Sequence, residues 1–124
     1  MASPGLEFAT YCAELLSSAG QPRLKGMFGG HGIYVDELFV AIVSSERLYL
    51  KTDAQTRSRF EAAGCVPFTY AGKGRTIEVG YFSPPEEAME SPALMQPWAS
   101  LALAAALRAR AATRAPARSR QRKA

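Results

Sequence analysis

Residues 32–52, GIYVDELFVAIVSSERLYLKT, contain three short runs that are rich in β-branched and aromatic residues. The short polar segments DE (36–37) and SSE (44–46) separate these runs, and connections of this length are typical of β-hairpins. The stretch therefore predicts an antiparallel meander, with a β-sheet at the centre of the fold.

The two later runs of this stretch differ in how their apolar side chains are distributed. Leu38–Val43 is apolar at every position, so it has apolar side chains on both faces of the sheet. In the run 47–51, Leu48 and Leu50 face one side, whereas the basic and tyrosine side chains face the other. We expect one face to be fully covered and the second only in part, so that a helix layer or a partner subunit could cover the remaining apolar patch.

Helical patterns flank the meander on both sides. Residues 7–20, EFATYCAELLSSAG, place their large apolar side chains on one stripe, and Gly20 supplies a C-terminal stop. After the meander, TDAQTRSRFEAAG predicts a short helix that is capped by Thr52 or Asp53 and closed by Gly64.

A second hairpin is predicted for residues 67–82, PFTYAGKGRTIEVGYF, in which two β runs surround GKG. Ser83 and Glu86 then form an S-x-x-E capping box, which predicts a helix start. Ser91 and Pro92 repeat this signal.

The C-terminal part combines an alanine-rich helix with a basic end. Because proline disrupts a helix interior, Pro97 is expected to separate a short turn from the helix at 98–112. Residues 113–124, TRAPARSRQRKA, have no large apolar side chain, so we expect a domain at 1–112 and a disordered or frayed basic tail at 113–124. The fold class predicted is α+β, with an antiparallel, or partly mixed, sheet and N-terminal, middle and C-terminal helices packed on it.

The net charge of +4 comes from the C-terminal end. Seven basic residues and no acidic residue lie from Arg108 onward, which leaves 15 − 7 = 8 basic and 11 acidic residues in 1–107. The balance before Arg108 is therefore −3.

Length and composition favour one soluble domain. The chain has 124 residues, of which 48% are hydrophobic and 21% charged, as in ordinary globular proteins. No apolar run approaches the roughly 20 residues that span a membrane, and the N-terminal sequence lacks the pattern of a secretion signal. We therefore expect a cytoplasmic protein.

Cys12 and Cys65 are expected to be reduced, buried thiols, because with one histidine they do not make a zinc set.

The segment KGMFGGHGIYVD, residues 25–36, holds three glycines around the only histidine. It lacks the lysine and hydroxyl of a phosphate loop, and GKGRT at 72–76 fits a hairpin turn. Glycine within a strand pattern usually marks a bulge, a bend or a close approach of backbones. We expect one long strand, 25–35, whose bend lets Met27 and Phe28 enter the core at one angle and Ile33 and Val35 at another. The alternative is a binding groove; the candidate residues for either are Met27, Phe28, Gly29, Gly30, His31 and Gly32.

Catalysis is not expected. His31 would need an oriented partner, and the nearest carboxylates, Asp36 and Glu37, lie across a predicted strand. The chain also lacks the G-x-S-x-G and H-E-x-x-H motifs and a paired-carboxylate motif. No cofactor or metal is predicted.

Three segments together resemble one family. They are MFGGHGIYVDELFVAIVSSERLYLKTD, FEAAGCVPFTY and YFSPPEEAMESPALMQPWASLALAAA, and they occur in the order and spacing of the TfoX N-terminal domain family, also called the TfoX/Sxy family. The resemblance covers residues 5 to about 110. We therefore expect a stand-alone N-terminal domain, followed by the basic tail.

The resemblance implies an α+β fold similar to those of type III secretion chaperones, which commonly dimerise. It also implies a role related to bacterial DNA transformation competence, in which full-length relatives are regulators thought to act with the cyclic-AMP receptor protein. The family has no established catalytic residues.

Three functions are therefore compared. The first is a non-enzymatic regulatory module that binds a protein, such as the transcription machinery or a regulator, through the sheet face or the alanine-rich helix, with a homodimer expected. The second is nonspecific nucleic-acid binding by the tail, with no membrane contact; its candidate residues are Arg114, Arg118, Arg120, Arg122 and Lys123. The third, least favoured, is a small-ligand site near His31, Tyr34 and Tyr49.

Overall fold

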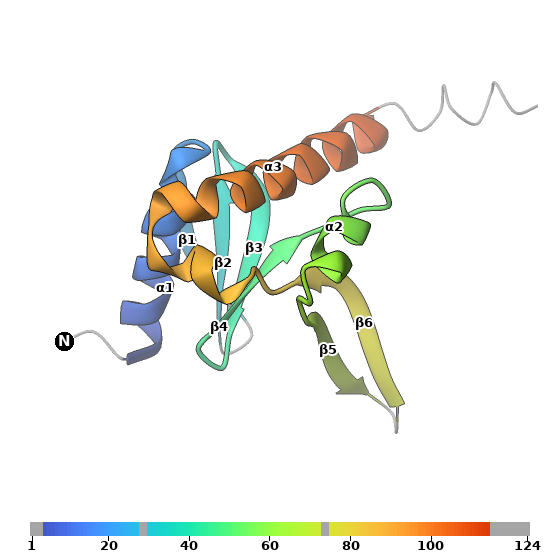
Figure 1. The fold of residues 1–124 in the computed structure, drawn as a ribbon, viewed down its shortest axis with the longest axis horizontal. Coiled ribbons are helices and arrows are strands. Elements are labelled where there is room, and N and C mark those ends of the chain that lie inside the picture. Colours follow the sequence, from blue (N-terminus) through green and yellow to red (C-terminus); the bar gives the residue numbers. More distant parts are fainter. Residues whose placement is uncertain (1–3, 28–29, 73–74, 115–124) are drawn as a thin grey trace, which may run out of the picture.

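The computed structural model describes residues 4–27, 30–72 and 75–114 of the chain (Figure 1). The elements follow one another in this order: helix α1 (Pro4–Leu15), the 3₁₀ turn η1 (Leu16–Ser18), strands β1 (Pro22–Met27), β2 (Gly30–Val35), β3 (Leu38–Ser44) and β4 (Arg47–Lys51), helix α2 (Arg57–Ala62), strands β5 (Pro67–Gly72) and β6 (Arg75–Phe82), the 3₁₀ turn η2 (Glu86–Glu90) and helix α3 (Pro92–Arg114).

The predicted meander is confirmed as strands β2, β3 and β4, which pair antiparallel in that order. Two-residue turns join the strands, at Asp36–Glu37 and at Ser45–Glu46, and φ lies between 51° and 66° at all four residues. Positive φ at both central positions is the pattern of type I′ turns, whose twist matches that of the strands they connect. The resulting register places Leu48 and Leu50 on the same face as the buried side chains of β3, as the sequence predicts.

The described strands form one antiparallel sheet in the order β1-β2-β3-β4-β6-β5, which confirms the α+β prediction. The second predicted hairpin is confirmed as β5 and β6, and it joins the sheet where Leu50 lies opposite Phe82. Near this junction β6 contains extra residues relative to β5, and Gly80 adopts a φ of 79°. Beyond this junction the hairpin extends away from the β1–β4 part of the sheet (Figure 1).

The glycine segment forms a second chain reversal rather than a bend in one strand. Strand β1 ends at Met27 and β2 begins at Gly30, and these two residues face each other in an antiparallel pair. The prediction of a single strand over 25–35 is therefore wrong. Ile33 and Val35 do enter the core, whereas the predictions for the Met27 side chain and for Phe28 and Gly29 fall outside what the structure describes.

Helices α1 and α3 pack on one face of the sheet, where α1 contacts β1 and β2 and α3 contacts β3 and β4 (Figure 1). The helix predicted at 7–20 is confirmed as α1 with η1. Alanines on α3 are buried against the sheet, so the helix approaches it closely. The largest buried side chains are Leu15, Leu16, Ile33, Val35, Val40, Leu50, Phe60, Phe82 and Met95. Cys12 is also buried, as predicted, and its burial raises the pKa of the thiol to about 12.

Helix α3 continues through Pro97, so the predicted separation of a short turn from the alanine-rich helix is wrong. Proline lacks the N–H that would bond the carbonyl of Ala93, four residues earlier. Both residues are exposed, so water can reach the freed carbonyl. The helix start predicted at Ser91–Pro92 is confirmed, and Ser91 Oγ accepts a hydrogen bond from the N–H of Leu94 at 3.2 Å.

Two predicted helix starts differ from the structure. Helix α2 begins at Arg57 rather than directly after Thr52 or Asp53. The Asp53 carboxylate nevertheless accepts the N–H groups of Gln55 and Thr56 in the turn that leads into the helix, as a capping side chain does. The capping box does not form. Ser83 Oγ accepts the N–H of Val66 at 3.0 Å, and Glu86 begins a 3₁₀ turn without a side-chain cap.

The described part of the chain ends with α3 at Arg114, two residues beyond the domain boundary predicted at 112. Residues 115–124, which include most of the predicted nucleic-acid contacts, lie outside the description. Across 4–27, 30–72 and 75–114, the structure contains no helix that is long and apolar enough to cross a membrane.

Candidate functional site

The two faces of the sheet differ in what covers them. Residues that pair across antiparallel strands share a face, so the register assigns side chains to faces directly. One face carries Ile33, Val43 and Leu50 against the helices, and these side chains are buried. The other face is only partly covered, as predicted. We call it the aromatic face, and its half-exposed apolar side chains are Tyr34, Phe39, Ile42, Tyr49, Phe68 and Tyr81.

The rings of the aromatic face contact one another in two groups. Phe39 lies 5.2 Å from Tyr34 and 6.1 Å from Tyr81, measured between ring centroids, and both pairs have edge-to-face geometry. Tyr49 and Phe68 form the second group, at 4.8 Å. Burial among these neighbours raises the pKa of the Tyr81 hydroxyl to about 12, with a smaller contribution from Tyr34.

Basic side chains are interleaved with these rings. The Arg23 guanidinium lies 4.5 Å from the centroid of the Tyr34 ring, and Lys51 Nζ lies 5.3 Å from that of Tyr81. Arg23 also bonds Glu37 in two places, at 2.9 and 3.1 Å, and this hydrogen bonding raises the pKa of the guanidinium. Since an arginine is charged at any ordinary pH, the shift changes nothing in its protonation.

His31 lies at the start of β2, opposite Gly26 on one side and Val43 on the other. It borders a hollow of about 270 Å³ whose lining also includes Gly30, Phe39 and Phe68. Strand alternation places Tyr34 on the opposite face from His31. The predicted small-ligand site of His31, Tyr34 and Tyr49 is therefore not assembled as one cluster.

The carboxylates nearest to His31 in the sequence have other partners. Asp36 Oδ1 accepts the N–H of Gln21 at 2.8 Å, and Glu37 bonds Arg23. Both lie at the far end of β2 from His31. Among the residues that the structure describes, no three histidine, cysteine or acidic side chains are grouped so as to hold a metal ion.

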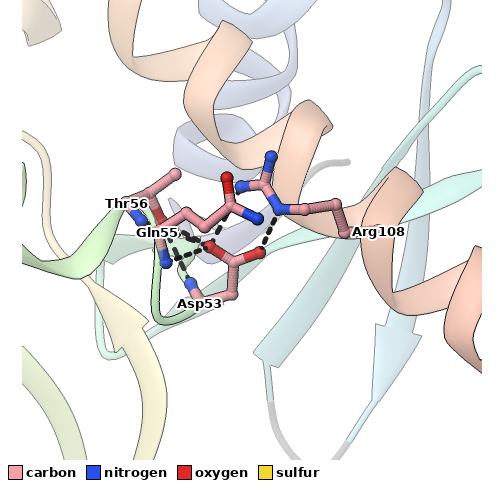
Figure 2. A network of polar contacts seen from close by, with 4 residues as sticks. All are labelled: Asp53, Gln55, Thr56 and Arg108. Atoms are coloured by element: carbon pink, nitrogen blue, oxygen red, sulfur yellow. Dashed lines mark hydrogen bonds and ion pairs between the residues drawn. The ribbon is translucent and has the colours of Figure 1, made fainter.

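Figure 2 shows a polar network that joins α3 to the turn before α2 and consists of Asp53, Gln55, Thr56 and Arg108. Arg108 donates to both carboxylate oxygens of Asp53, from Nε at 2.6 Å and from Nη2 at 3.0 Å. The backbone N–H groups of Gln55 and Thr56 donate to the same carboxylate, at 3.0 and 3.2 Å. The bond from Arg108 holds the pKa of Asp53 below its usual range. Arg108 is therefore a structural residue, although the sequence shows it only as the first of a basic run.

A groove of about 900 Å³ lies between α1 and η2, and we call it the α1–η2 groove. It is lined by Phe8, Tyr11, Glu46, Arg47, Leu48, Ala63, Gly64, Cys65, Val66, Ser83, Pro84, Pro85, Glu86, Glu87, Met89 and Trp98. The Tyr11 hydroxyl donates to the carbonyl of Met89, which ties the two walls together. Val66 is 50% exposed and Tyr11 40%, so apolar surface remains open to solvent in and beside the groove.

The charged side chains of the α1–η2 groove are mainly acidic, and its one cysteine is unreactive. Three carboxylates, at Glu46, Glu86 and Glu87, are opposed by one guanidinium, at Arg47. Cys65 is half-buried rather than buried as predicted, and burial followed by the charge of Glu87 raises the pKa of its thiol. A raised pKa keeps the thiol protonated at neutral pH, so the residue is a poor nucleophile.

The sequence offered no sign of this groove, because its lining comes from segments between residues 8 and 98 with no local pattern. The predicted glycine site contributes Gly30 and His31 to the small hollow, while Gly32 lies opposite Ile42 beside it. Of the predicted tail contacts, the structure describes the backbone of Arg114 as the end of α3. Nucleic-acid contact by Arg118, Arg120, Arg122 and Lys123 stays a prediction.

Comparison with known proteins gives two findings. Residues 14–106 match the profile of the family described as the TfoX N-terminal domain. Over 74 residues, the chain is also 31% identical to a protein of Aliivibrio fischeri named DNA transformation protein TfoX1. This match covers 60% of the chain but only 35% of the relative, so the chain spans about a third of the length of that protein.

Proposed function

Because the chain belongs to the TfoX N-terminal domain family, we propose that it is a cytoplasmic, non-catalytic regulatory module that acts in DNA transformation by binding another protein. The name of the Aliivibrio fischeri relative supports the link with transformation. A regulator of transcription, or part of the transcription machinery, is the class of partner that the family suggests. The homodimer expected from the sequence stays a prediction.

The α1–η2 groove is the observation that carries the proposal. Its apolar lining, with Val66 half-exposed, is a surface that a partner can remove from water. Three carboxylates against one guanidinium favour a partner segment with positive charge. An amphipathic helix that carries leucines on one face and lysines beside them meets both requirements.

The only tryptophan of the chain, Trp98, lines this groove and can report its occupancy. We expect a synthetic leucine- and lysine-containing helical peptide to shift the Trp98 emission to shorter wavelength and to saturate. A peptide with glutamates in place of the lysines should bind at least tenfold more weakly, because the rim is acidic.

Val66→Asp tests the site, since this side chain is half-exposed and the substitution need not disturb the core. The matched control is Leu107→Asp, which changes another exposed apolar residue, 43% accessible, on α3 outside the groove. The first variant should lose the peptide-dependent emission change and lower the transformation frequency of the native host, and the second should do neither. Equal behaviour of the two variants would refute the groove as the binding site.

A further inference from the structure

The aromatic face presents rings from five different strands, and each ring is partly exposed. Tyr34, Phe39, Tyr49, Phe68 and Tyr81 come from β2, β3, β4, β5 and β6 respectively. The flat platform that results is wide, because neighbouring strands lie about 4.8 Å apart. A sheet face that only had to contact water would not need rings at this density, so the face is suited to a ligand that is itself flat and aromatic.

The charges of this face have one predominant sign. The register places Arg23 opposite Tyr34, Lys25 opposite Gly32 and Lys51 opposite Tyr81, and these three basic side chains therefore belong to the aromatic face. The sequences of β1 to β5 contain no aspartate or glutamate, whereas β6 contains Glu78, which lies opposite Thr69 of β5. Other acidic groups stand in the turns, where Glu37 pairs with Arg23 and Glu46 precedes Arg47 at the rim of the α1–η2 groove.

The glycine segment shapes the same face. Gly32 lies opposite Ile42, and Gly30 borders the 270 Å³ hollow with Phe39, Ile42 and Phe68. Gly32 is buried, and the backbone carbonyl of Val43 occupies the space that a Cβ on Gly30 would need, so backbone forms this edge of the hollow. The hollow is lined mainly by apolar atoms, which suits the face of a planar ring.

We propose that the aromatic face binds single-stranded nucleic acid. Bases stack on the rings, above all on Tyr49 and Phe68, while Lys25 and Lys51 neutralise phosphates that pass along the platform. A duplex fits poorly, because its bases are already stacked inside the helix and cannot reach the rings. A second copy of the chain fits poorly as well, since two such faces would bring like charges together.

The proposal concerns a surface other than the peptide site, and it is tested separately. A fluorescein-labelled oligothymidylate of about 12 nucleotides is titrated at low salt with the whole chain of residues 1–124, and binding is followed by fluorescence anisotropy. A duplex of equal length serves as the comparison. We expect the single strand to bind at least tenfold more tightly than the duplex.

Two variants separate stacking from charge. Phe68→Leu keeps an apolar side chain but removes the ring, and should weaken single-strand binding about tenfold without changing its salt dependence. Lys25→Glu should weaken binding and also reduce the salt dependence, because a phosphate contact is lost. Arg59→Glu, an equal charge reversal at an exposed position of α2, should leave single-strand binding within twofold of the parent.

Three outcomes would overturn the proposal. Equal binding of duplex and single strand would assign the binding to charge alone, as a basic tail would give. Parent-like binding by Phe68→Leu, with unchanged thermal unfolding, would do the same. Light scattering that shows a dimer lost in Phe68→Leu, with no oligonucleotide binding by the parent, would assign the face to a second copy.

Discussion

At the scale of single residues, the backbone of the neighbouring strand explains why position 30 is a glycine. A Cβ added at this position would lie 2.2 Å from the carbonyl oxygen of Val43, which belongs to the sheet and cannot move aside freely. Gly30→Ala is therefore expected to lower the free energy of unfolding by about 1–3 kcal/mol, as overpacking typically does. Urea denaturation of parent and variant measures the difference.

Gly26→Ala is the control for this substitution. Gly26 lies in β1, across the hairpin from β2, and an added Cβ meets no atom within 4 Å. An alanine there should be neutral, or stabilising by up to about 1 kcal/mol, because it restricts the unfolded chain. If the two variants lost equal stability, the close approach at Gly30 would not be the reason for its glycine.

At the scale of elements, the ion pair of Asp53 and Arg108 joins α3 to the turn before α2. Arg108→Gln removes both hydrogen bonds to the carboxylate, so we expect the melting temperature to fall by a few degrees at neutral pH. Arg110→Gln, two residues later on the exposed side of the same helix, changes the net charge equally and should leave the melting temperature unaltered.

The pH dependence of this difference follows from the depressed pKa of Asp53. A carboxyl whose pKa is lower in the folded state than in the unfolded state, where it is near 3.8, stabilises the fold at any pH above that value. This stabilisation is lost as pH falls through the lower, folded pKa. The gap in melting temperature between the parent and Arg108→Gln should therefore be constant near neutrality and shrink below about pH 4. A gap that widened in acid would contradict this role.

Elements with a local pattern were predictable from the sequence, and elements that depend on distant partners were not. Helix α1 and strands β2 to β4 follow from periodicity within a few residues. Strand β1 was not predicted as a separate strand, and its residues 25–27 were joined to β2. Pro22, Arg23, Lys25 and Gly26 give it little apolar alternation, and its pairing with β2 defines it. Similarly, Asp53 accepts the N–H groups of the turn that leads into α2, as a cap does, but its pairing with Arg108 was not predictable. No pattern within one segment reveals a contact across 55 residues.

At the scale of the whole molecule, both candidate surfaces combine segments that are far apart in the chain. The sequence predicted that one sheet face would be less covered than the other, because the run 47–51 alternates. It did not predict which rings would meet, since Tyr49 and Phe68 become neighbours only when the β5–β6 hairpin joins the sheet. The α1–η2 groove likewise exists only once α1, α3 and η2 are packed together.

Charge is the second property of the whole molecule, and it separates the tail from the folded part. Residues 115–124 carry four positive charges, at Arg118, Arg120, Arg122 and Lys123, and no acidic residue, so removing them reduces the net charge from +4 to 4 − 4 = 0. If the tail contacts duplex DNA, this deletion should make the slope of log affinity against log salt shallower by up to about 4 × 0.9 = 3.6. Filter retention of a labelled duplex over a series of salt concentrations measures the slope.

The same deletion should leave the folded part and its aromatic face intact, because the contacts described above involve residues up to Arg108. Its melting temperature should match that of the parent, and its preference for single strand over duplex should increase, since only the nonspecific, charge-driven term is removed. An unchanged salt slope with duplex would mean that the four charges act as a solvated end rather than as a binding segment. Loss of single-strand binding together with duplex binding would instead place all nucleic-acid contact in the tail.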